Sequence, residues 1–236
     1  MILADIDGVF VSLSGKPNTA ALQLAAQYAR RQPVAFLTGR ERAALEEIFL
    51  PAWERAWESS TPPHELCVGA EYGAILLTPT PENIWQEELT LDTVPAAAAR
   101  AAVQEVAQRY PKLVFRKRKR IVLTVAIPSV PDWDTPERRA QLAAADPELQ
   151  EIAQRFGLTI QYSTKAIDLL PPGLDKTYGA EVILSRLRHT PEHVHIFGDA
   201  PADKLMTVAC ERRGLPFSYY HVDSDEETAE ILRGLG

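Results

Sequence analysis

Cysteine is scarce in this sequence, and an excess of positive charge is missing. Cys67 and Cys210 are the only cysteines among the 236 residues. They lie far apart and form no CxxC pair, so we expect neither a disulfide framework nor a zinc site, and both should pack as small buried hydrophobic side chains. The formal net charge of −7 argues against nucleic acid as a partner, because phosphate backbones require a clustered positive face.

Long hydrophobic runs are missing as well. No apolar run reaches the roughly 18 residues of a membrane-spanning helix. The first ten residues, MILADIDGVF, lack the basic region, the long apolar region and the cleavage site of a secretory signal peptide. We therefore expect a cytoplasmic protein with no membrane partner, either a monomer or a homodimer.

The sequence also has no internal repeat and none of the GxSxG, Walker A or HExxH motifs of other enzyme classes. What it does have is the composition of a folded globular protein, with 46% hydrophobic and 24% charged residues. This length is sufficient for one large domain, or for a core with a smaller insert, without disulfides or a structural metal.

Three short apolar segments share one design: 1–4, 34–37 and 194–197 each end abruptly in small or polar residues. Each is predicted to be a buried strand. Helical patterns lie between and after these strands, and the alternation predicts an α/β fold with a parallel sheet. The predicted helices are 18–31, 41 to about 58, 176–187, 203–213 and 226–232.

The middle of the chain has a different pattern. Apolar segments at 121–127 and 158–162 alternate with helical stretches at 95–110 and 136–156, and prolines cluster nearby. We predict a separate α+β insert over 81–168, between the two parts of a core formed by 1–80 and 169–236.

Two aspartates follow the first predicted strand. Asp5 and Asp7 lie two positions apart, so both can face the crevice at the carboxyl ends of the strands, where Thr38 and Asp199 are also expected. Carboxylates this close do not ionise together easily, which suits a nucleophile and a general acid. Gly8 allows a tight turn beneath a phosphate. Turns and calcium loops use the same DxDG pattern, so these residues alone do not decide the chemistry.

The second and last strands end in further polar residues. Thr38, Gly39 and Arg40 offer a hydroxyl and backbone N–H groups to a phosphate, although Thr38 is equally suited to cap a helix. Lys176 begins a helix after a Pro-Pro-Gly turn and can balance the charge of the phosphate and of Asp5, although a lone lysine is usually only solvated.

Asp199 and Asp203 add two carboxylates to the same crevice. Four carboxylates around a phosphate repel it and one another unless a hard divalent ion lies among them, and Mg²⁺ fits that requirement. We therefore expect Mg²⁺ as the cofactor. A helix N-cap is an alternative role for Asp203 and is compatible with metal binding.

In order along the chain, DIDG at 5–8, LTGR at 37–40, Lys176 and GDxxxD at 198–203 resemble the four signature motifs of the haloacid dehalogenase superfamily. The resemblance implies a Rossmann-like core with Asp5 as the nucleophile and Asp7 as the acid and base. It also implies Thr38 and Lys176 on phosphate oxygens, and Mg²⁺ on Asp5, the Asp7 backbone carbonyl and Asp199, with Asp203 in support.

The acid at position 7 is typical of the phosphatases and mutases of this superfamily and is absent from its dehalogenases. The insert resembles the α+β cap of sugar phosphatases, such as those acting on trehalose phosphate and sucrose phosphate, and of phosphomannomutase. Gly69–Ala74 resembles the segment entering that cap. Val9, Tyr72 and Ala202 depart from the residues common in these relatives. The resemblance thus predicts a small-molecule phosphate ester, with a sugar phosphate first, as the substrate.

The basic run RKRKR at 116–120 can contact an anionic group of the substrate, or it can be solvated or guard an exposed sheet edge. His193 and His195 enter an apolar strand and are expected to be structural. Two alternatives to a phosphatase stay open. One is a sugar phosphomutase, because 173–176 resembles phosphomannomutase, and the other is a phosphosugar-binding regulator without turnover.

Overall fold

The computed structural model describes residues 1–12, 14–57, 65–80, 82, 84–91, 93–128 and 134–235. The chain divides into two compact units. Met1–Thr90 and Asp175–Gly236 form the larger unit, and Leu91–Leu174 form the smaller unit.

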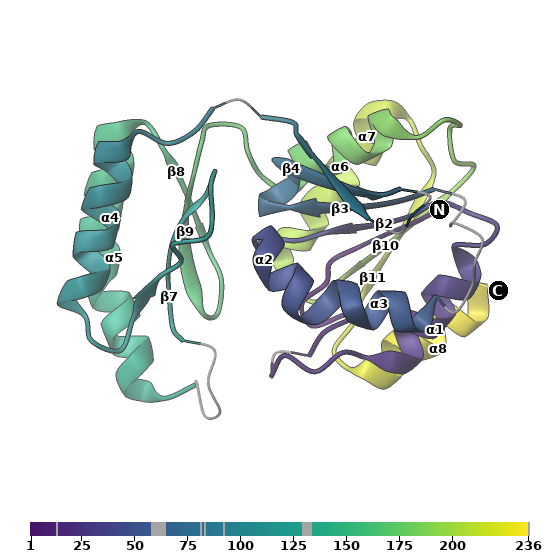
Figure 1. Cartoon of the computed structure of the whole chain (residues 1–236), viewed down its shortest axis with the longest axis horizontal. Helices are drawn as coiled ribbons and strands as arrows, with labels where there is room; N and C mark the ends of the chain where they lie inside the picture. The colour runs from purple at the N-terminus through teal and green to yellow at the C-terminus, as the bar shows by residue number, and fades with distance from the viewer. Residues whose placement is uncertain are drawn as a thin grey trace. The chain divides into compact units, whose positions relative to one another are not determined.

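The larger unit contains a seven-stranded sheet in the order β11-β10-β1-β2-β3-β4-β5 (Figure 1). The first five strands in this order are parallel, and β4 and β5 add an antiparallel edge. The three predicted strands are adjacent, because β1 pairs with β2 on one side and with β10 on the other. The strands are β1 Ile2–Ala4, β2 Val34–Leu37, β3 Leu66–Ala70, β4 Ile75–Pro79, β5 Trp85–Leu89, β10 Val194–Gly198 and β11 Phe217–His221.

Helices cover both faces of this sheet, as the predicted alternation requires. The helices of the larger unit are α1 Thr19–Tyr28, α2 Arg42–Ala44, α3 Leu50–Ala56, α6 Lys176–Arg186, α7 Leu205–Arg213 and α8 Asp225–Leu235. Successive strand residues point to opposite faces. Ile2 and Phe36 therefore pack with α1, α3 and α8, whereas Leu3 and Ala35 pack with α6 and α7. The α/β class expected from the sequence is confirmed.

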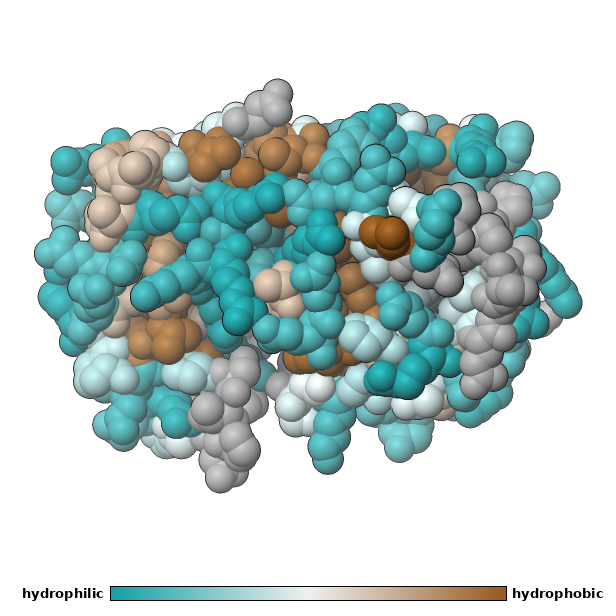
Figure 2. Space-filling model, in the orientation of Figure 1, coloured by the Kyte–Doolittle hydropathy of each residue, from teal (hydrophilic) through white to brown (hydrophobic). Residues whose placement is uncertain are grey.

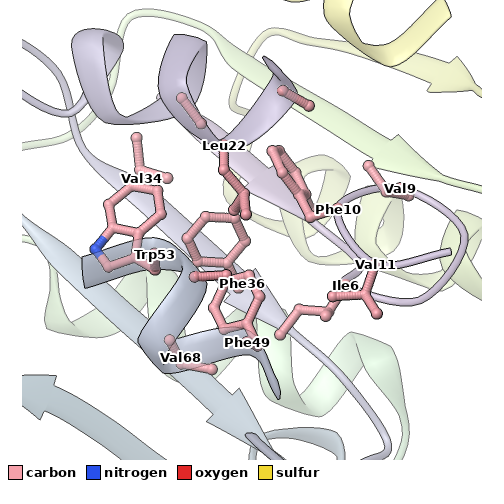
Figure 3. Close-up of a cluster of buried hydrophobic side chains, with 14 of the residues drawn as sticks. Ile6, Val9, Phe10, Val11, Leu22, Val34, Phe36, Phe49, Trp53 and Val68 are labelled. Atoms are coloured by element: carbon pink, nitrogen blue, oxygen red, sulfur yellow. The ribbon is translucent and has the colours of Figure 1, made fainter. Parts of the chain in front are cut away.

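An aromatic cluster fixes β2 against the helices on one face (Figure 3). The ring of Phe36 lies edge-on to Phe10, Phe49 and Trp53, with centroid distances of 5.1, 4.8 and 5.1 Å. Such pairs contribute about 0.5–1.5 kcal/mol each beyond the area that they bury. Because Phe10 belongs to the loop after β1, this cluster also holds that loop against β2.

Polar caps explain where two of the helices begin. Asn18 accepts a hydrogen bond from the backbone N–H of Ala21 (3.1 Å), and Asp175 accepts one from Tyr178 (2.9 Å). These caps satisfy N–H groups that have no partner inside the helix.

Two predicted helices are less regular than expected. The helix predicted from residue 41 consists of α2, a π-helical turn over Leu45–Phe49 and α3, and its predicted end at residue 58 lies outside the described residues. Pro51 lies in the first turn of α3 and has no N–H, so the wider turn before it replaces a regular helical turn. The helix predicted from Asp203 starts later, at Leu205, after a 3₁₀ turn over Pro201–Lys204.

The smaller unit has a four-stranded antiparallel sheet in the order β6-β7-β9-β8 (Figure 1). Residues of both its helices and its strands form a separate hydrophobic core. The helices lie close to the stretches predicted at 95–110 and 136–156. The elements are α4 Ala97–Arg109, α5 Pro136–Phe156, β6 Val114–Phe115, β7 Leu123–Ala126, β8 Thr159–Tyr162 and β9 Ala166–Leu170.

Hydrogen bonds determine where the larger unit ends. The backbone N–H of Thr90 donates to the carbonyl oxygen of Ala74 (3.0 Å), and its hydroxyl donates to that of Gly73 (2.6 Å). The hydroxyl of Tyr178 donates to the carbonyl oxygen of Thr90 (2.6 Å). The chain leaves the larger unit after this anchor and returns at Asp175. The smaller unit therefore begins and ends later in the chain than the predicted insert of 81–168. The first residue of that prediction, 81, is outside the described part.

The basic run at 116–120 is not uniformly solvated. Lys119 is buried, and its ammonium lies 3.2 Å from a carboxylate oxygen of Asp168, which also accepts a hydrogen bond from the hydroxyl of Thr124. Thr124 and Asp168 are directly opposite each other on β7 and β9. One lysine of the run, Lys119, thus forms a buried ion pair within the smaller unit.

Hydrophobic side chains are mostly internal in both units, and hydrophilic residues predominate on the face shown in Figure 2. Cys67 and Cys210 are buried free thiols, as predicted. Burial raises the pKa of the Cys67 thiol to about 12. No helix in the described part of the chain is long and apolar enough to span a membrane.

Candidate active site

The carboxyl ends of three adjacent strands bring the predicted site residues to one edge of the sheet. Asp5 follows β1, Thr38 follows β2 and Asp199 follows β10. The register aligns Ala4 with Phe36 and Phe197, so Asp5 is level with Leu37 and Gly198, and Thr38 and Asp199 follow one residue further along. This is the edge at which ligands bind in parallel α/β sheets.

Lys176 joins two of the carboxylates. Its ammonium lies 2.9 Å from Asp5 Oδ1 and also contacts Asp203 Oδ1. All three side chains are buried. The other oxygen of Asp203 accepts a hydrogen bond from the backbone N–H of Ala200 (2.8 Å), which fixes the carboxylate at the turn after β10. One oxygen of Asp203 thus caps the turn after β10, and the other binds Lys176.

The charges in this cluster do not balance. Burial raises the pKa of Asp5 well above its ordinary value, and the carboxylates of Asp203 and Asp7 raise it further, while Lys176 opposes the shift. Burial, followed by repulsion from Asp203, raises the pKa of Asp199 to about 6. Burial lowers the pKa of Lys176, but the two carboxylates beside it outweigh that effect and raise the pKa. One lysine therefore faces an excess of negative charge.

The donor set suits a metal ion. Asp5, Asp199 and Asp203 each offer a carboxylate oxygen, and these oxygens lie within 4.8 Å of one another. A set made only of oxygen ligands is typical of hard divalent cations, which would also compensate the unbalanced negative charge. The residues present therefore fit a divalent cation.

Two glycines allow the loops to approach this closely. Gly8 has a φ of 71°, and a Cβ atom there would lie 2.0 Å from Asp199 Oδ2. A Cβ atom on Gly198 would lie 2.2 Å from the Cβ of Asp203. The turn after β1 can thus contact Asp199 only without a side chain at position 8, and the turn after β10 can fold back onto its strand only without one at position 198.

We expect Gly8→Ala to lose divalent-cation binding and to unfold at a lower temperature. The new methyl group would displace the Asp199 carboxylate, and the positive φ adds a backbone cost of about 1–2 kcal/mol. Gly15→Ala is the matched control, because Gly15 has a φ of 86° but no atom within 4 Å of a Cβ. Calorimetric titration with Mg²⁺ and thermal unfolding would show the difference. Equal effects of the two substitutions would contradict the role given to the Gly8 contact.

Thr38 and Gly39 form a braced turn at the end of β2. The Thr38 hydroxyl accepts a hydrogen bond from the backbone N–H of Arg40 (3.1 Å), and its own N–H donates to Gly69 (2.9 Å). Thr38 is fully buried, and the residue preceding α2 is Glu41, so Thr38 does not cap that helix. The ring of Tyr72 packs on Gly39, where a Cβ atom would lie 2.9 Å from Tyr72 Cζ.

The side chains of Asp7 and Arg40 contact each other. Arg40 Nε lies 3.0 and 2.9 Å from the two carboxylate oxygens of Asp7, and Nη2 also donates to Oδ1. Of the residues predicted to hold a metal, Asp5, Asp199 and Asp203 form the cluster, whereas the Asp7 carboxylate binds Arg40. Arg40, predicted as a phosphate ligand, therefore has a carboxylate as its partner in this structure.

Comparison with known proteins gives the fold but no match by sequence. No protein-family model matches the chain, and no curated protein matches it. Among solved structures, it is similar to the C-terminal domain of trehalose-6-phosphate phosphatase from C. albicans, with a TM-score of 0.70 and 13% identity over 99% of this chain and 90% of that one. A haloacid dehalogenase-like hydrolase from Bacteroides thetaiotaomicron has a TM-score of 0.66 and 12% identity, over 100% and 98% of the two chains. A trehalose-6-phosphate phosphatase from Aspergillus fumigatus has a TM-score of 0.54 and 19% identity, over 99% and 91%.

The chain has the haloacid dehalogenase-like fold. The fold class predicted from the motifs is thereby confirmed, and the similarity extends over both units, because these matches cover at least 99% of the chain.

A turn that no motif predicts supports the candidate site. Glu71, Tyr72 and Gly73 form a turn in which all three residues have positive φ, at 47°, 62° and 85°. The N–H groups of Glu71 and Tyr72 donate to the carbonyl oxygens of Arg40 and Thr38, at 2.9 Å each. Left-handed backbone at non-glycine residues costs on the order of 1 kcal/mol each and is concentrated at functional sites.

The sequence carried a partial signal for this turn. The segment 69–74 contains two glycines and resembles a segment that enters a cap, but nothing in its sequence predicts that its N–H groups reach the end of β2. Gly73 also contacts α6, because its Cβ would lie 2.4 Å from the Cα of Gly179. The turn thus ties the end of β2 to the helix that begins with Lys176.

His195 in β10 and His193, one residue before that strand, lie at the opposite edge of the haloacid dehalogenase-like core. The backbone N–H of His195 donates to Met1, and the terminal amine of Met1 donates to His193, at the beginning of β1. Ser218 and Tyr220 on β11 lie at hydrogen-bonding distance from the two imidazoles. Burial, followed by repulsion from His193, lowers the pKa of His195 to about 4. These contacts agree with the structural role expected for both residues.

Proposed function

We propose that this protein is a phosphatase that hydrolyses a small phosphate monoester, with a sugar phosphate as the leading substrate class. The observation that carries the proposal is the cluster of Asp5, Lys176, Asp199 and Asp203 at the carboxyl edge of the sheet. A buried carboxylate beside an ammonium and a cation-binding oxygen set is suited to phosphoryl transfer.

In the proposed reaction, a carboxylate oxygen of Asp5 attacks phosphorus. The new oxygen–phosphorus bond forms as the bond to the ester oxygen breaks, and Asp7 gives that oxygen a proton as the alcohol leaves. Asp7 then takes a proton from the water that attacks the aspartyl phosphate. Inorganic phosphate leaves, and the carboxylate of Asp5 is restored.

The remaining residues bind and orient the phosphate. Lys176, the hydroxyl of Thr38 and the backbone of Gly39 are placed to contact its oxygens, as the motif resemblance implies. Asp5, Asp199 and Asp203 would hold Mg²⁺, with Asp7 contributing its backbone carbonyl. The cation supplies compensation for the charge of the phosphate and of the carboxylates.

The smaller unit is proposed to act as the cap that selects the substrate. Trehalose-6-phosphate phosphatases are similar over both units, which supports a sugar phosphate. An IMP-nucleotidase from Plasmodium falciparum is also similar in structure, with a TM-score of 0.65 and 11% identity, over 99% of this chain and 67% of that one. Nucleoside monophosphates therefore belong among the tested compounds.

Phosphate release from a panel of phosphorylated metabolites tests this proposal. The panel contains sugar phosphates, nucleoside monophosphates and 4-nitrophenyl phosphate, each with Mg²⁺ and with EDTA. Mg²⁺-dependent release from at least one ester is the expected result. Interconversion of sugar phosphates that requires a bisphosphate would favour the mutase, and tight binding without turnover of any ester would favour the regulator.

Mg²⁺ is expected to stabilise the protein more strongly at about pH 7.5 than at about pH 5. The pKa of Asp199 is raised from 3.8 to about 6, so without metal the folded state binds more protons than the unfolded state between these values. The stability of the metal-free protein therefore falls as the pH rises through this window, and the ionised carboxylate that results is the form that binds Mg²⁺. Saturating Mg²⁺ should raise Tm by ~5 °C or more at the higher pH.

Thermal unfolding in EDTA and in Mg²⁺ at both pH values measures this effect. K⁺ at matched ionic strength controls for screening of surface charges. An increase in Tm that is equal at both pH values, or the same with K⁺, would argue against a cation bound by Asp199.

A further inference from the structure

The contact between Arg40 and Asp7 has the geometry of a fork. Nε is within 3.0 Å of both carboxylate oxygens, and Nη2 adds a second donor to Oδ1. The two side chains are partly shielded, with exposed fractions of 23% for Arg40 and 33% for Asp7. A planar guanidinium that donates to both oxygens fixes the orientation of a carboxylate, which a single point charge does not.

The backbone of Arg40 is itself held on both sides. Its N–H donates to the hydroxyl of Thr38 (3.1 Å), and its carbonyl oxygen accepts from Glu71 (2.9 Å). The left-handed turn that begins at Glu71 therefore fixes the point from which the Arg40 side chain extends. Arg42, two residues later, has different partners, because its guanidinium contacts Glu46 (2.7 Å) and Glu87 (3.2 Å).

The turn that carries Asp7 is tight but leaves this side chain partly exposed. Gly8 donates its N–H to Val11 (2.8 Å), and Ile6 on the other side is fully buried, so the backbone around Asp7 is fixed. The carboxylate of Asp7 is instead held by Arg40, a residue from the loop after β2. Its orientation is thus set by Arg40.

We propose that Arg40 is the positioning residue of Asp7, and that it orients this carboxylate toward the leaving oxygen instead of binding the phosphate. The proposal rests on the proposed phosphatase function, in which Asp7 exchanges protons with the leaving alcohol and with water. Arg40 would then act on the reaction only through Asp7. Loss of a phosphate ligand would instead lower kcat/KM equally for every phosphate ester.

Esters with different leaving groups separate these two roles. The nitrophenolate of 4-nitrophenyl phosphate leaves without a proton, whereas the alcohol of a sugar phosphate requires one. In Arg40→Lys, kcat/KM should fall by about tenfold or more for the sugar phosphate that the panel shows to be hydrolysed fastest. For 4-nitrophenyl phosphate it should fall by less than about threefold, because kcat/KM covers only the steps up to release of the alcohol.

Arg42→Lys is the matched control, and it should leave both values of kcat/KM unchanged. Arg40→Gln serves as a second variant, and thermal unfolding of each protein shows whether it folds. In an Asp7→Asn background, Arg40→Lys should have no further effect on the sugar phosphate, because a residue that acts only through Asp7 loses its role with that carboxylate.

Equal losses of kcat/KM on both esters, or additive losses with Asp7→Asn, would overturn the proposal and favour a phosphate ligand. Failure of the proposed function is a separate result: the wild-type protein would then release no phosphate from either ester. That result would remove the role of Arg40 together with that of Asp7.

Discussion

Asp5→Asn is expected to reduce phosphate release by ~10³-fold or more, because the amide oxygen cannot form the aspartyl phosphate. The substitution keeps the shape of the side chain and removes one buried negative charge. Since burial already raises the pKa of Asp5, the neutral residue should fold at least as well as the wild type without metal. Loss of turnover with an unchanged or higher Tm is the combined expectation.

Steady-state phosphate release and thermal unfolding in EDTA measure the two effects. Asp223→Asn makes the same chemical change at an exposed aspartate that lies 3.3 Å from His221, and it should leave turnover unchanged. A third measurement, the mass of the wild-type protein after acid quenching during turnover, should detect a phosphoryl group on the peptide that contains Asp5. If Asp5→Asn kept more than about one tenth of the wild-type rate, Asp5 would not be the nucleophile.

Lys176→Met is expected to destabilise the metal-free protein by about 3 kcal/mol or more. The ammonium is buried between Asp5 and Asp203, and its removal leaves two buried carboxylates without their cation. Methionine has a similar length and no charge, so packing changes little while the electrostatic compensation is lost. Turnover should also be lost, because Lys176 is proposed to contact the phosphate.

Urea unfolding in EDTA, with and without subsequent addition of Mg²⁺, measures this effect. Mg²⁺ should restore part of the lost stability, because the cation binds the same carboxylates. Lys204→Met is the control: Lys204 lies in the turn next to Asp203 but is exposed. A loss of stability no larger than that of the control would mean that Lys176 does not compensate the buried charges.

Three of the four motifs were readable in the sequence because Asp5, Thr38 and Asp199 each directly follow a strand. Period-two strands and the parallel topology place Asp5, Thr38 and Asp199 at one edge regardless of the details of packing. The same argument explains why the α/β class was predictable, since buried parallel strands are short apolar runs separated by helices. The strand pattern therefore indicates that Asp5, Thr38 and Asp199 lie at one edge, although it does not give the distances between them.

Contacts between loops distant in the sequence could not be predicted in this way. Nothing in the local sequence of Arg40 distinguishes a phosphate ligand from a partner of Asp7, because that choice depends on the rotamer set by neighbouring loops. The positive φ of Glu71 and Tyr72 was equally hidden, because neither residue type favours it. The boundary after Thr90 depends on hydrogen bonds to the distant Tyr178.

The sequence by itself determined which carboxylates follow the buried strands, and hence which of them gather at one edge of a parallel sheet. Local periodicity is sufficient for this, because strand direction and side-chain alternation are properties of the chain. Only the tertiary structure decided that Lys176 lies between Asp5 and Asp203, that Lys119 is buried against Asp168, and that Arg40 holds Asp7. Each of these pairings depends on the burial and distance of residues far apart in the chain, which no local pattern encodes.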